Sequence, residues 1–247
     1  MSPLKTRRRL MAMALFAVLP AAGRAADLPG SQSAAFQRFD AVFIPALFLT
    51  GSAGKTADGP AKALAATRRL SEQWPSLRPE LIAAVPGQRA WLKAVQAAQA
   101  HMHEAYNLAA KAQWGQSHEA LEHVRQVLFE TRRSLGIDYA LDEFTAYHEA
   151  MESLANATSV QRPTFEVNFA TARALWRHIE VMNFDATTYG LSEARARQLA
   201  QARADETNAL SALSQTLNTG SDADVLKAAA AIKPPFVRAY VAFGTPL

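Results

Sequence analysis

The 247-residue chain contains no cysteine. This absence excludes disulfide bonds, zinc–thiolate sites, covalent c-type haem attachment and thiol nucleophiles. The chain also lacks the Gly-x-Ser-x-Gly turn of serine hydrolases, and its Gly54-Lys55-Thr56 is without the first glycine of a phosphate-binding loop. These absences favour a protein that is not an enzyme.

Strand signals are also missing, because β-branched runs are absent and alternating patterns last only a few residues. Alanine-rich stretches with apolar residues at helical spacing are present instead, joined by short polar turns. The pattern predicts an all-α fold, an up-and-down helical bundle of about six to eight helices. The main helices are expected over residues 33–50, 60–75, 86–113, 117–134, 138–155, 165–184 and 192–217.

Turn residues set the expected helix ends. Pro60 favours a helix start, and Pro75 predicts the end of that helix. No linker forces a domain boundary, so residues 26–247 are expected to form a single helical domain, with a seam near 160–163 as the alternative. The side chains expected to be most buried are Trp91, Tyr106, Leu121, Val124, Leu128, Phe144, Phe169 and Trp176.

Residues 1–25 have the order of an export signal peptide. A basic start (Lys5, Arg7, Arg8, Arg9) precedes a short apolar run and a small-x-small site ending at Ala25. The arginine pair resembles a bacterial twin-arginine signal, although general secretory signals carry the same arginines, so the route stays open. The run is too short to anchor the protein in a bilayer. The mature protein is therefore expected in the periplasm and not to span the membrane.

The leader also accounts for the basic charge of the whole chain. It holds five of the 26 Lys and Arg residues and none of the 22 Asp and Glu residues, which leaves residues 26–247 with a formal charge of −1. A basic surface for nucleic acid is not expected, and nucleic acid is rejected as a partner.

Residues 26–247 contain three methionines, and each lies within four residues of a histidine. All six histidines of the chain fall between residues 101 and 178. The pairs are Met102 with His101 and His103, Met151 with His148, and Met182 with His178. Thioether and imidazole groups together are ligands that copper uses where no thiolate is present. The pattern predicts metal ligands at His148 and Met151 first, His178 and Met182 second, and Met102 with His101 or His103 third.

Two further His–Glu pairs have a spacing of four residues, in His-Glu-Ala-x-Glu at 118–122 and 148–152. This spacing is suited to Zn²⁺, Fe²⁺ or Ni²⁺. His118 and Glu122 are nevertheless expected to face solvent, because they point away from the apolar residues of their helix.

The first functional hypothesis is a periplasmic helical bundle that binds a copper ion and acts in metal handling or sensing, with a periplasmic or membrane metal-transport protein as a further partner. A cofactor-free adaptor or chaperone-like protein is the first alternative. A bundle that binds haem b between Met102 and His148 is the second.

Overall fold

The computed structural model describes residues 30–247, so the predicted leader, residues 1–25, lies outside the described part. Within that part the chain forms nine α-helices and no strand, which confirms the all-α prediction. Seven are long: α1 (Gly30–Ser52), α2 (Gly59–Ala84), α3 (Arg89–Ala110), α4 (Trp114–Ser134), α5 (Ala140–Ala155), α6 (Arg162–Val181) and α7 (Glu193–Thr219). Two are short: α8 (Asp222–Ala230) and α9 (Lys233–Val241). The 3₁₀ turn η1 (Ala53–Lys55) follows α1.

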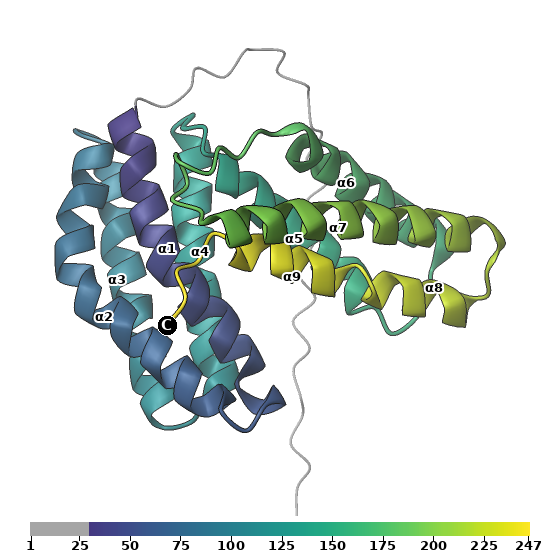
Figure 1. The fold of residues 1–247 in the computed structure, drawn as a ribbon, viewed down its shortest axis with the longest axis horizontal. Coiled ribbons are helices and arrows are strands. Elements are labelled where there is room, and N and C mark those ends of the chain that lie inside the picture. Colours follow the sequence, from purple (N-terminus) through teal and green to yellow (C-terminus); the bar gives the residue numbers. More distant parts are fainter. Residues whose placement is uncertain (1–29) are drawn as a thin grey trace, which may run out of the picture.

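The helices form two packed groups (Figure 1). In the first, α1 to α4 lie side by side, and α1 packs against both α2 and α4 so that the four close into a bundle. In the second, α5, α6, α7 and α9 pack in the same cyclic manner, with α8 against α5 and α7. Helix α7 runs across the direction of α1 (Figure 1).

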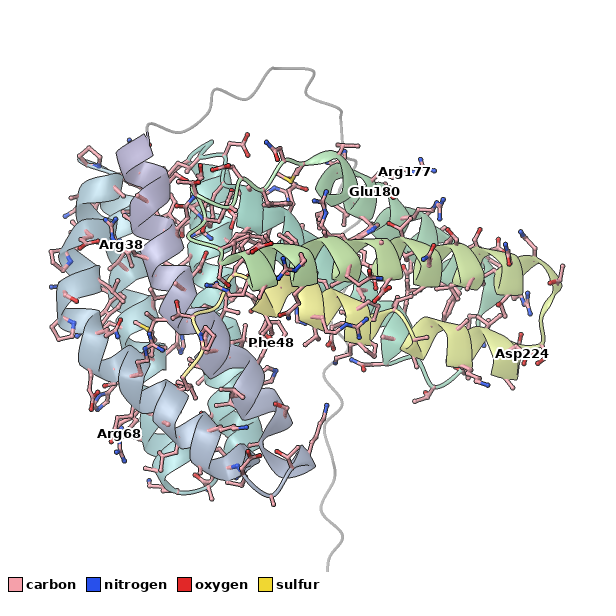
Figure 2. The ribbon with its side chains drawn as sticks, viewed as in Figure 1. Arg38, Phe48, Arg68, Arg177, Glu180 and Asp224 are labelled. Atoms are coloured by element: carbon pink, nitrogen blue, oxygen red, sulfur yellow. The ribbon has the colours of Figure 1, made fainter. Side chains whose placement is uncertain are left out.

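The two groups meet along α4–α5 and α1–α9. One contiguous hydrophobic core extends through both, from Ala35 to Phe243. Aromatic contacts cross the junction: the rings of Phe48 on α1 and Tyr240 on α9 are 5.4 Å apart, edge to face. Figure 2 labels Phe48 where α1 passes α9. The change from one group to the other occurs between α4 and α5.

Most of the expected core residues are buried, but Tyr106 is only half-buried. The predicted helix end at Pro75 is wrong, because α2 continues through Pro75 and Pro79 to Ala84. A proline inside a helix costs about 3 kcal/mol. Here the continued helix buries Leu77 and Leu81 against the core, and the Leu81 carbonyl accepts a 2.6 Å hydrogen bond from the Trp91 indole. This burial offsets the loss of two backbone hydrogen bonds.

No helix among residues 30–247 is long and apolar enough to cross a membrane.

Candidate functional site

The structure places the three predicted methionine–histidine pairs at three separate locations. Met102 is buried on α3 and lines a cavity next to Trp74 of α2, together with the exposed His103. Met182 is the half-buried C-cap residue that follows α6, and it lines a different cavity, while the His178 side chain is 71% exposed.

The third pair, on α5, is divided between core and cavity. The Met151 side chain is fully enclosed in the core. His148 instead lines the cavity where the two helix groups meet. Met102 and His148, the two candidate haem ligands, therefore face different cavities.

No three His, Asp or Glu side chains among the described residues are placed together as a set that could hold a metal ion. Two histidines are nevertheless brought together that the sequence spacing did not pair. His101 of α3 lies against His123 of α4, with ring centroids 5.1 Å apart and ring planes at 47°. The Nδ1 atom of His101 is 3.7 Å from a carboxylate oxygen of Glu104.

The cavity between the helix groups, which we call the central cavity, has a volume of about 430 Å³. Its walls come from α1, η1, α4, α5, α7 and α9 and from the residues after α9. Both His-Glu-Ala-x-Glu segments contribute to it: His118 and Glu122 from α4, and His148 and Glu152 from α5. Motifs that lie thirty residues apart in sequence thus line one cavity.

His118 is held in place by the backbone of α1. Its Nδ1 is 2.9 Å from the Leu47 carbonyl oxygen, which makes Nδ1 the protonated nitrogen in the neutral ring. Its Nε2 lies 3.7 Å from Glu122. The ring also packs directly on Gly51, where an added Cβ would lie 2.9 Å from a ring carbon. Glycine at position 51 is therefore what allows the imidazole to approach α1.

His118 and Glu122 are half-buried, with side-chain exposures of 33% and 18%, so the expectation that they face solvent is wrong. His118 contacts α1 of the first group, and both side chains line the central cavity together with residues of α5, α7 and α9. The pattern of a single helix contains no signal for these contacts with other helices.

The charges of both glutamates are compensated. Glu122 accepts from Nε and Nη2 of the buried Arg125, at 2.7 and 2.6 Å. Glu152 pairs with Lys233 and lies 3.4 Å from Nε2 of His148, whose ring stacks on Phe236. The pKa of Glu152 is lowered to about 2, mainly by its hydrogen bond with His148 and to a smaller extent by Lys233. Both carboxylates are thus already paired with cations.

Comparison with known protein families, curated proteins and solved structures finds no match for this chain.

Proposed function

We propose that this protein is an exported helical bundle that binds a transition-metal ion, copper in first place, through the histidine pair His101–His123. The observation that carries the proposal is the approach of two imidazoles from neighbouring helices. An imidazole nitrogen binds such an ion at about 2.0–2.1 Å, and two rings on one tetrahedral ion then have centroids about 5 Å apart. The observed separation is 5.1 Å.

The surroundings of the pair support a ligand role. Metal-binding histidines commonly direct their second ring nitrogen at a carboxylate, which fixes the ring and increases its basicity. Glu104 has this relation to Nδ1 of His101, which leaves Nε2 for an ion. Both histidines are accessible, since His123 is exposed and the His101 side chain is 34% exposed. Water molecules can therefore complete the coordination.

The donor atoms determine which ion is favoured. Imidazole nitrogen is a borderline ligand, and divalent ions bound by it follow the Irving–Williams order, in which Cu²⁺ exceeds Ni²⁺ and Zn²⁺. Met102 is next to His101 in sequence but buried on another face of α3. The proposed site therefore uses nitrogen and oxygen ligands, and an exported protein of this kind is suited to metal handling or sensing.

The test is a Cu²⁺ titration of the mature protein by calorimetry, with electron paramagnetic resonance to identify nitrogen ligands. We expect one ion per chain, and a loss of affinity of about tenfold or more in His123→Ala and in His101→Ala. The matched control is His103→Ala, an exposed histidine beside the pair, which should retain the affinity of the wild type.

Substitutions Met102→Leu, Met151→Leu and Met182→Leu test the thioether ligands separately. Each conserves volume, and only a loss of copper affinity would assign sulfur to the site. If the wild type binds no copper, or if His123→Ala binds it unchanged, the metal proposal is wrong and the adaptor hypothesis becomes the better one.

A further inference from the structure

The central cavity has the size and composition of a small-molecule site. Ligand sites in proteins are typically concave, about 300–1,000 Å³ in volume, and mostly apolar with a few polar groups. The central cavity, at about 430 Å³, falls in this range. Its apolar wall consists of Pro45, Phe48, Leu49, Val237, Val241 and Leu247.

Arg195 of α7 contributes a cation to this cavity. Its Nε donates to the Ala242 carbonyl over 2.8 Å and its Nη1 to the Gly190 carbonyl over 3.3 Å. Both acceptors are neutral, and within residues 30–247 no carboxylate pairs with this guanidinium. Burial lowers the pKa of Arg195, which reflects the partial desolvation of a cation that has no counter-ion. A guanidinium has five N–H donors, so it retains capacity for a further acceptor.

The remaining charges of the cavity favour the same kind of ligand. Glu122 and Glu152 are neutralised by Arg125 and Lys233, as described above. Lys55 also lines the cavity, and among the described residues it too has no carboxylate partner. Among the charges that line the cavity, the cations of Arg195 and Lys55 are thus the ones without a carboxylate partner, and they lie in the same cavity as the apolar wall. An acidic group would gain charge-assisted hydrogen bonds there, whereas a basic group would be repelled.

We propose that the central cavity binds a small amphipathic organic anion, with its apolar body against α1 and α9 and its acidic group on Arg195. This site is independent of the histidine pair on α3 and α4, and its residues are different. Metal binding and anion binding can therefore each fail without affecting the other.

The experiment uses two fluorescent probes with the same aromatic skeleton. Anilinonaphthalene sulfonate has an acidic group, and phenylnaphthylamine has none; both brighten on transfer to an apolar site. In fluorescence titrations of the mature protein we expect saturable binding of both, with the sulfonate bound about tenfold more tightly. A tenfold difference corresponds to about 1.4 kcal/mol.

Variants assign this binding to the cavity. Arg195→Gln should raise the Kd of the sulfonate about tenfold and leave that of the neutral probe within about twofold, whereas Arg195→Lys, which keeps the charge, should retain most of the preference. The control is Arg197→Gln, two residues along α7, where the exposed arginine pairs with Glu193. Circular dichroism checks that each variant is folded.

A second pair of variants tests the apolar wall. Val237→Trp should fill the cavity and weaken both probes, and Val167→Trp, at an exposed position on α6, should weaken neither. Binding that is unaffected by Val237→Trp lies elsewhere and overturns the proposal. Equal binding of the two probes, or an unchanged sulfonate Kd in Arg195→Gln, overturns the anionic assignment.

Discussion

The backbone N–H of Thr245 donates to the carbonyl oxygen of Ala41 over 2.7 Å. In an uninterrupted helix this carbonyl accepts from the residue four positions later, but that residue is Pro45, which has no N–H. The segment after α9 thus supplies the donor that α1 lacks. Because residues 244–247 also line the central cavity, the same hydrogen bond fixes one of its walls.

Because the segment after α9 packs closely on α1, we expect Gly244→Ala to be destabilising. An added Cβ would lie 2.8 Å from the Pro45 ring, and such overpacking typically costs about 1–3 kcal/mol. Urea unfolding measures the change. In the double variant with Pro45→Ala the clash is removed, so the two effects should not add. The control is Gly115→Ala in α4, where nothing lies within 4 Å of the new methyl group. An equal effect of the two glycine substitutions would contradict the prediction.

We expect a large loss of stability when the buried Arg132 of α4, which pairs with Asp142 of α5, is replaced. Arg132 donates twice to Asp142, over 2.8 and 2.5 Å, and lies over the rings of Phe36 and Tyr139. Arg132→Ala leaves the half-buried Asp142 carboxylate unpaired. Removing one partner of a buried ion pair typically lowers the free energy of unfolding by about 3–5 kcal/mol. The neighbouring Arg133 is exposed, and Arg133→Ala should change the unfolding free energy by less than about 0.5 kcal/mol. Similar values for both variants would show that this ion pair is unimportant.

The buried Glu206 of α7 predicts a pH dependence of stability. It accepts a hydrogen bond from the Tyr147 hydroxyl, its Oε2 has no partner, and burial raises its pKa from 4.5 to about 8. Between these values the folded protein holds a proton that the unfolded chain has lost, so stability falls as the pH rises from about 4.5 to about 8. The raised pKa of Asp40, about 6, acts in the same direction.

Glu206→Gln removes this proton and should flatten the fall in stability above about pH 6, as followed by urea unfolding at several pH values. The control is Glu166→Gln, at an exposed position of α6, which should keep the wild-type slope. A wild-type slope in Glu206→Gln would mean that the carboxyl is ionised throughout.

The predicted leader has its own test. Intact-mass measurement of the exported protein should place the first residue at or near Ala26. Replacing Arg7 and Arg8 by lysine should abolish export only if the twin-arginine route is used. A membrane-bound protein that retains Met1 would contradict both the cleavage and the location.

Sequence periodicity was enough to determine the helices and most of their buried faces. Trp91, Leu121, Val124 and Trp176 follow the 3.6-residue repeat, and all four are buried. The repeat is a local property of the chain, and the burial of one apolar face follows from it in any bundle. The prediction of a helix end at Pro75 was wrong, because the packing of later residues of α2 outweighs the local effect of a proline, and Tyr106 is only half-buried.

The tertiary structure alone decided which side chains come together in the candidate sites. Sequence proximity associated His101 with Met102, whereas the fold places His101 against His123, twenty-two residues away. Adjacent helical residues point about 100° apart, so neighbours in sequence rarely share a site. Likewise His118 was expected in solvent, whereas the fold places its ring against α1, in the cavity between the two helix groups. The sequence specifies which side of its own helix each residue occupies, and only the packing of the helices against one another decides which residues that side contacts.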